Sequence, residues 1–140
     1  MKLLLISILL STYLSAQDFV KGEDIVHDKK HKLLWQDSFS NVKEQFTFEG
    51  AQQYCKDLVL KGRSNWYVPS REEYSYIIDK SRDDEIMINR AFKYIMSVKY
   101  WTSESTWRSL GRYGYFVYFK SGNIYYQNKT YKKFVRCVSK

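Results

Sequence analysis

The sequence predicts an α+β fold in which two helices pack on a twisted antiparallel sheet. Apolar residues recur at helical spacing in two segments of the first half, and strand-like alternation dominates the last third. A length of 140 residues suits one hydrophobic core rather than two. Because no repeat or Pro/Gly-rich linker divides the chain, we expect a single domain over residues 17–140.

The first 16 residues have the layout of a secretory signal peptide. Lys2 precedes an apolar run from Leu3 to Leu10, and Leu14-Ser15-Ala16 forms a small-residue cleavage site. The run is too short for a membrane span, and no second long apolar segment follows. We therefore expect an exported protein, periplasmic or extracellular, that begins at Gln17. A buried N-terminal strand or helix is the alternative.

A hairpin is predicted next. Residues 24–28 and 32–36 form strand-like segments, and the polar turn 29–31 separates them. Residues 37–46 are polar and are expected to form a loop.

The first helix is predicted to begin at Thr47, which can cap it, and to end at Gly62. Four residues share one helical face because their spacings are three, four and three: Phe48, Ala51, Cys55 and Leu58. Cys55 therefore belongs to the buried face.

The stretch NWYVPSREEY (65–74) predicts the start of the second helix, which runs to about residue 80. Trp66 belongs to an extended segment, and Pro69 disfavours helix at the residue before it. Ser70 and Glu73 fit a capping box, in which each side chain accepts from the other residue's amide. A catalytic carboxylate pair, Glu72 with Glu73, is the alternative. Neighbouring residues point in different directions on a helix, so we favour the cap.

The segment 81–99 has mixed character, with a charged turn at 82–85 and a short helix expected near Ile88–Tyr94. The acids of the turn lack the alternating spacing of a calcium loop, so no metal site is predicted there. Strands are expected at 100–103, 113–120, 124–127 and 131–138, with a hairpin turn at Ser121-Gly122-Asn123.

Cys55 and Cys137 are the only cysteines. An oxidising compartment favours one intramolecular disulfide, which would join the first helix to the last strand. A metal pair or a reactive thiol is the alternative, although two cysteines without a nearby histidine cluster make a poor zinc site. We expect the disulfide and no cofactor.

The formal net charge of +8 favours anionic partners such as acidic polysaccharide, lipid headgroups or nucleic acid. Nucleic acid is the least suitable partner of an exported chain, and we expect none. Two candidate patches for an anionic ligand are Lys29, Lys30 and Lys32, and Lys129, Lys132 and Lys133. A scattered, solvated surface is the alternative for each patch.

Seven stretches of the chain form a recognisable series: DIVHDKKHKLLWQD (24–37), AQQYCKDL (51–58), NWYVPSREEY (65–74), INRAF (88–92), YWTSE (100–104), the strand and SGN turn at 115–124, and FVRCVSK (134–140). In this order they resemble the family named after the C-terminal domain of the Legionella collagen-like protein. The resemblance covers nearly the whole mature chain. It implies a C-type-lectin-like fold and a bridge between Cys55 and Cys137. The chain departs from the usual family residues at two places, and both keep an apolar character. Tyr67-Val68 replaces the usual Arg-Leu pair, and Tyr74 replaces a common Leu.

Related lectins bind sugars through calcium, with a Glu-Pro-Asn loop and a Trp-Asn-Asp strand. Here Val68 and Ser70 flank Pro69, and Asn65-Trp66 has the wrong order, so calcium-dependent sugar binding is not expected. The formylglycine-generating oxidases share the broad fold but need reactive cysteines, and both cysteines here are assigned to the bridge.

We therefore expect a non-enzymatic binding or adhesion domain for an anionic polysaccharide or a cell-envelope protein. The implied fold, the positive charge and 13 tyrosines support this hypothesis. Alternation along residues 113–120 places Tyr113, Tyr115, Val117 and Phe119 on one face and Phe116, Tyr118 and Lys120 on the other. Aromatic faces of this kind can stack on sugars or simply pack in the core. The alternatives are a structural or assembly subunit of the envelope and a hydrolase of envelope polymers. The hydrolase is disfavoured because Asp37, Asp57 and Asp79 have no partners visible in sequence.

Overall fold

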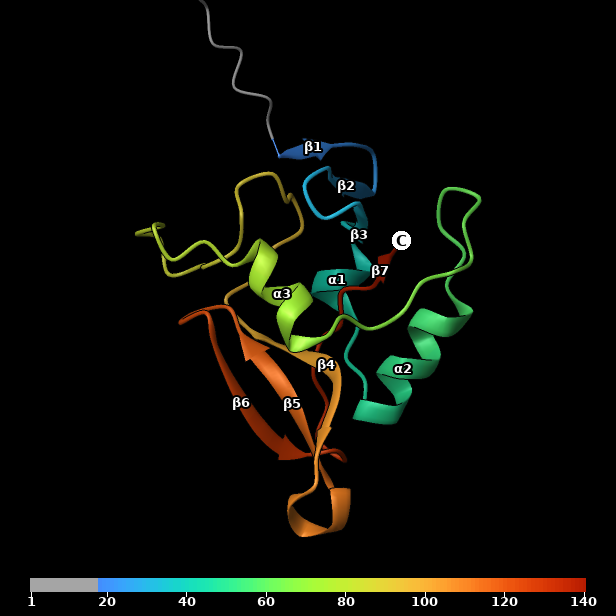
Figure 1. Cartoon of the computed structure of the whole chain (residues 1–140), viewed down its shortest axis with the longest axis vertical. Coiled ribbons are helices and arrows are strands. Elements are labelled where there is room, and N and C mark those ends of the chain that lie inside the picture. The colour runs from blue at the N-terminus through green and yellow to red at the C-terminus, as the bar shows by residue number, and fades with distance from the viewer. Residues whose placement is uncertain (1–17) are drawn as a thin grey trace, which may run out of the picture.

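The computed structural model describes residues 18–140, and the signal peptide predicted over residues 1–16 lies outside them. Two antiparallel sheets and three α-helices form an α+β architecture (Figure 1). We expected one sheet; the strands instead divide into a four-stranded and a three-stranded sheet. Among the helices of the described residues, none has the length and apolar character needed to cross a bilayer.

The first sheet has the order β1-β2-β3-β7. It contains β1 (Phe19–Lys21), β2 (Ile25–Asp28), β3 (Leu33–Gln36) and β7 (Val138–Ser139). The hairpin of β2 and β3 confirms the predicted one, whereas β1 was not predicted. Val26 and Trp35 are paired and fully buried, so this hairpin contributes one face to the core.

The second sheet has the order β4-β5-β6, with strands at β4 (Lys99–Thr106), β5 (Tyr113–Tyr118) and β6 (Asn123–Asn128). The three predicted strands and the hairpin between the last two are confirmed, although β4 is longer and β5 two residues shorter than expected. The turn occupies residues 119–122 instead of 121–123, because Asn123 already belongs to β6. Phe116 pairs with Trp101 on one side and with Tyr125 on the other. A bulge between Trp101 and Ser105 shifts the register of β4 against β5.

The prediction of a strand over 131–138 was wrong, because only its last residue belongs to a regular ladder, that of β7. The segment runs between the two sheets and divides its backbone hydrogen bonds among four parts of the chain. Lys133 pairs with Phe46, Phe134 with Lys99 and Trp101, Cys137 with Gln36, and Val138 with Tyr67. This segment therefore links the sheets instead of extending one of them.

The helices are α1 (Ser40–Lys43), α2 (Phe48–Asp57) and α3 (Arg71–Ile77). Thr47 caps α2 as predicted, because its side chain accepts from the amide of Gly50. Gly62 does not end this helix: the helix ends at Asp57, and Gly62 occupies a separate turn with φ 70°. A Cβ at position 114 would lie 2.3 Å from the Phe48 ring, so glycine there allows α2 to approach β5.

Two further predictions about helices were wrong. Residues 37–46 were expected to form a loop but include α1, and residues 88–94 form turns instead of a helix. The amides of Lys93 and Tyr94 donate to the carboxylate of Asp37, at 2.8 and 2.9 Å. Contacts with a distant residue therefore hold this segment, and helical periodicity does not determine its conformation.

The capping box at α3 is confirmed. The Ser70 hydroxyl accepts from the Glu73 amide at 3.1 Å, and the Glu73 carboxylate accepts from the Ser70 amide at 2.9 Å. The second carboxylate oxygen of Glu73 accepts from the Tyr67 hydroxyl at 2.7 Å. Burial and this hydrogen bond raise the pKa of Tyr67. Both oxygens of Glu73 thus have structural partners, as the cap interpretation requires.

The core consists of two clusters. One lies between the four-stranded sheet, α3 and the inner face of the three-stranded sheet, and includes Trp35, Tyr74 and Val117. The other surrounds α2 and contains the disulfide between Cys55 and Cys137. Both cysteines are fully buried, and their Cα atoms lie 5.5 Å apart. The predicted disulfide is therefore confirmed, and it joins α2 to the C-terminal segment.

We expect Glu73→Ala to lower the free energy of unfolding by about 1–2 kcal/mol, because it removes one cap and leaves the Ser70 amide without its acceptor. The matched control is Glu72→Ala, which changes an exposed residue of the same turn and should have a smaller effect. Urea denaturation followed by circular dichroism measures both. Equal losses would contradict the assigned role of Glu73.

Candidate functional site

One face of the three-stranded sheet combines lysines with aromatic rings. Residues paired across antiparallel strands point to the same face. The pairs Lys99 with Tyr118 and Phe116 with Tyr125 therefore lie on one side of the sheet. Phe116 and Tyr125 are in contact, with ring centroids 5.8 Å apart.

Two open hollows adjoin on this face. One, of about 310 Å³, is lined by Lys99, Tyr118, Lys132 and Lys133 among others. The second, of about 340 Å³, shares Lys99 and Tyr118 and adds Phe116 and Tyr125. Of the described residues that line either hollow, none is acidic. We call the two hollows together the cationic groove and define it by six residues: Lys99, Phe116, Tyr118, Tyr125, Lys132 and Lys133.

Lys133 lies beneath the surface of this groove, with only 4% of the residue exposed. Its backbone is held by two hydrogen bonds with Phe46, at 2.8 and 2.9 Å. Its Nζ lies 4.3 Å from the centroid of the Phe116 ring and 4.8 Å from that of Trp101, and it donates to Gln127 Oε1. Burial and, secondly, repulsion by Lys99 lower the pKa of Lys133 to about 8.

Lys99 is exposed above the same rings. Its Nζ lies 5.7 Å from the centroid of Phe116 and 5.6 Å from that of Tyr118. Lys99 and Lys133 therefore approach one aromatic ring from positions where their charges repel each other. An anion bound in the groove would relieve this repulsion.

Tyr125 offers an aromatic surface at the outer part of the groove, with 45% of the residue exposed. Hydrogen bonds with the side chains of Asn123 and Ser121 lower the pKa of its hydroxyl. A sugar ring can stack on such a partly exposed aromatic face while its charged groups approach the lysines. The groove thus has the chemistry for an acidic carbohydrate.

The two lysine patches predicted from the sequence lie beside different sheets, and the second patch does not stay together. Lys29, Lys30 and Lys32 are exposed around the turn between β2 and β3, on the other sheet. Lys132 and Lys133 line the cationic groove, but Lys129 does not: its Nζ lies 3.8 Å from the carboxylate of Glu49 and 4.7 Å from the ring of Phe48.

Sequence reasoning missed Lys99 as a site residue. The alternation of β5 places Phe116 and Tyr118 on one face, but the partner of Tyr118 on β4 depends on the register between strands. A bulge in β4 alters that register. The only local signal was the lysine at the start of a predicted strand.

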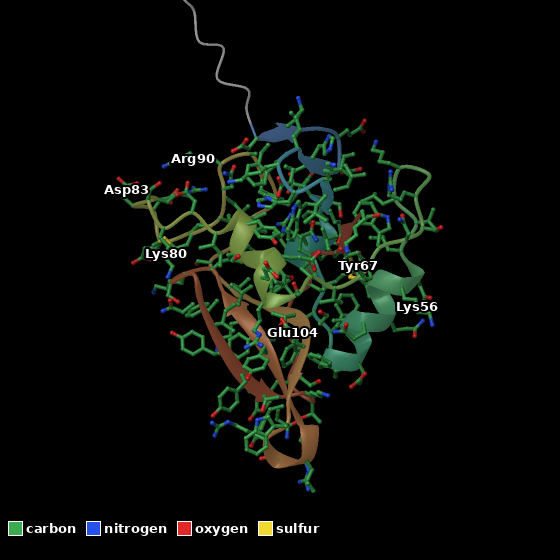
Figure 2. The ribbon with its side chains drawn as sticks, viewed as in Figure 1. Lys56, Tyr67, Lys80, Asp83, Arg90 and Glu104 are labelled. Atoms are coloured by element: carbon green, nitrogen blue, oxygen red, sulfur yellow. A yellow bond between two sulfur atoms is a disulfide. The ribbon has the colours of Figure 1, made fainter. Side chains whose placement is uncertain are left out.

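Arg71, at the start of α3, and Glu104, on β4 and labelled in Figure 2, form a second polar group. The Arg71 guanidinium lies 3.2 Å from Glu104 and stacks 4.0 Å from the centroid of Tyr115. The hollow beside it contains two acids, Glu72 and Glu104. Because Glu104 neutralises Arg71, this group is a poorer anion site than the cationic groove.

The acids considered for hydrolysis lie on separate elements. Asp37 is buried against Arg136, with 3.2 Å between Oδ1 and Nη1. Asp57 accepts from Gln53, and Asp79 accepts from Ser81, which lowers the pKa of Asp79. Within residues 18–140, no three His, Cys, Asp or Glu side chains gather as a metal site would require.

We expect the stability of the protein to rise relative to that of Lys133→Met as the pH increases from 8 to 10. A lysine with a folded pKa near 8 and an ordinary value of 10.5 binds fewer protons in the folded state between these values. Stability therefore increases with pH in this window, and the variant lacks this contribution. Urea denaturation of both proteins at several pH values measures the difference, and parallel pH profiles would contradict the lowered pKa.

Comparison with known proteins identifies the family. The sequence model of the Lcl C-terminal domain matches residues 24–139. No curated protein matches the chain. The two antiparallel sheets, the helices and the Cys55–Cys137 bridge agree with a C-type-lectin-like fold. The match spans most of the chain, and the protein therefore belongs to the Lcl C-terminal domain family.

Proposed function

We propose that the protein is an exported, non-enzymatic binding domain that recognises an anionic glycan in its cationic groove without calcium. One observation carries the proposal: three lysines and five aromatic residues line adjoining hollows whose described lining includes no acid. This combination matches a ligand that has both sugar rings and negative charges.

The two exposed lysines and the buried one have different roles in this proposal. Lys99 and Lys132 contact the sulfate or carboxylate groups of the glycan directly, because their side chains are exposed. Lys133 adds positive potential from below the surface, where water screens its charge less. Each exposed ion pair contributes only about 0.2–1 kcal/mol, so binding depends on several simultaneous contacts and weakens with salt.

Export is part of the proposal. A buried disulfide is typical of proteins that fold in an oxidising compartment, and the Cys55–Cys137 bridge is such a bond. The predicted signal peptide supports the same location. An exported domain meets the acidic polysaccharides of cell surfaces, which are the class of ligand that the groove suits.

We expect the double variant Lys99→Ala/Lys132→Ala to bind a heparin-type sulfated polysaccharide about tenfold more weakly, because two ionic contacts are lost. The matched control is Lys29→Ala/Lys30→Ala, which removes the same charge from the other sheet and should change affinity much less. Isothermal titration calorimetry at 50 mM salt measures both. Equal losses would show binding by overall charge, and no binding by the unchanged protein would refute the proposal.

We also expect Tyr125→Ala to weaken binding of the same polysaccharide several-fold, whereas Tyr125→Phe retains most of the affinity. Alanine removes the stacking surface, but phenylalanine keeps the ring. Titration of the two variants under the same conditions measures the contribution of the ring. Equal affinities for Tyr125→Ala and the unchanged protein would exclude stacking on this residue.

A further inference from the structure

The connection between β4 and β5 lies at the lower end of the molecule in Figure 1, far from β1. It carries two exposed large apolar side chains. Trp107 is 86% exposed and Leu110 is 90% exposed, the highest values among the large hydrophobic residues of the described chain. The other three tryptophans are buried. We call residues 107–112 the hairpin tip; it includes the short 3₁₀ helix η1 (Arg108–Gly111).

The backbone of the hairpin tip is poorly matched to its residues. Ser109 (φ 50°, ψ 42°) and Leu110 (φ 57°, ψ 37°) are consecutive left-handed residues, and Gly111 follows with φ 75°. Glycine and asparagine are the residues that adopt this left-handed conformation at the lowest steric cost. Leucine carries a steric cost in this conformation, and its exposed side chain gains little packing within the protein. The intramolecular fold therefore does not account for leucine at position 110.

Positive charges flank the apolar pair. Arg108 and Arg112 are exposed on either side of the turn, and the Arg108 guanidinium lies 5.8 Å from the Trp107 ring and 5.9 Å from the Tyr126 ring. From Ser105 to Lys140 the sequence has eight basic residues and no acid. Of the nearby acids, Glu104 is paired with Arg71 and Glu49 with Lys129. The charges around the apolar pair are thus of one sign.

We propose that the hairpin tip docks on an anionic lipid surface. Trp107 and Leu110 enter the headgroup region, and Arg108 and Arg112 contact lipid phosphates. Tryptophan favours the membrane–water interface, and basic residues near an anionic leaflet add electrostatic attraction. Two apolar side chains on a projecting turn offer far less area than the roughly 1,200 Å² of a stable protein interface. A small apolar tip can bind a lipid surface, because the attraction between the flanking arginines and anionic headgroups adds to the burial of the apolar side chains.

This surface is separate from the cationic groove. Lys99 begins β4, and the tip follows its last residue, Thr106. At about 3.3 Å per residue, the strand separates Lys99 from the tip by roughly 20 Å. The two surfaces come closest where the Arg108 guanidinium lies 5.9 Å from the ring of Tyr126, which also lines the second hollow. None of the tip residues 107–112 lines either hollow, so the two proposals can fail independently.

The test is a vesicle titration of the protein beginning at Gln17, which contains every described residue. Because the other three tryptophans are buried, Trp107 dominates any change in fluorescence. With vesicles of 30% phosphatidylglycerol in phosphatidylcholine, we expect a blue shift, protection from acrylamide quenching and co-sedimentation. Pure phosphatidylcholine vesicles should bind the protein at least about tenfold more weakly. No shift and no sedimentation with the anionic vesicles would overturn the proposal.

The sharpest variant is Ser109→Asn/Leu110→Gly. It supplies residues that adopt the left-handed conformation at lower steric cost, so the thermal midpoint should be unchanged or higher. Binding to anionic vesicles should nevertheless fall about tenfold, because Leu110 is lost. Arg108→Ala/Arg112→Ala should also lose binding, whereas the control Lys29→Ala/Lys30→Ala should retain it. If the turn and arginine variants bind vesicles as well as the unchanged protein does, the tip is not the docking site.

The same experiments distinguish two other ligands of the hairpin tip, a glycan and a second copy of the chain. A Trp107 blue shift with soluble sulfated polysaccharide in place of vesicles would assign the tip to glycan binding and overturn the lipid proposal. Self-association in the absence of vesicles, lost in Ser109→Asn/Leu110→Gly during analytical ultracentrifugation, would assign it to contact between copies of the chain. That result would also overturn the proposal.

Discussion

The buried ion pair of Arg136 and Asp37 connects three parts of the chain that lie far apart in the sequence. Arg136 is fully buried, and Asp37 is 2% exposed. Besides its contact with Asp37, the guanidinium donates to the carbonyls of Gln36, at 2.5 Å, and Tyr94. Removing one partner of such a pair typically costs about 3–5 kcal/mol, which is a large fraction of the roughly 5–15 kcal/mol that stabilises a domain. The end of β3, the turns before β4 and the C-terminal segment are therefore mutually dependent.

The placement of Arg136 also positions its neighbours in the C-terminal segment. Cys137 follows directly, and its amide donates to the side chain of Gln36 at 3.1 Å. Its disulfide then attaches α2. Lys133, three residues before Arg136, pairs with Phe46 and directs its ammonium group toward Phe116 on the other sheet. The buried Arg136 therefore helps to position Lys133 beneath the cationic groove, because both belong to the same short extended segment.

Sequence patterns predicted the features that depend on residues within a few positions of each other. These features are the turn between β5 and β6, the capping box of Ser70 and the face of α2 that contains Cys55. The errors concern segments held by distant partners. Residues 88–94 take their conformation from Asp37, more than 50 residues earlier, and residues 131–137 pair with three separate segments instead of one strand. Lys99 lies in the groove because it pairs with Tyr118, and this pairing depends on a bulge in β4 that shifts the register against β5. The local patterns together predicted the α+β class, and the family resemblance supplied the C-type-lectin-like fold, which no single local pattern determines.

The disulfide has a consequence for the proposed exported state of the protein. Its two cysteines are 82 residues apart, and the long connection between α3 and β4 lies within that interval. Lys80, Asp83 and Arg90 project from this connection (Figure 2), where a protease has access to charged residues. A single cut there leaves two polypeptides that remain covalently joined through the buried Cys55–Cys137 bond. The three-stranded sheet with its groove would then stay attached to the rest of the domain after proteolytic nicking.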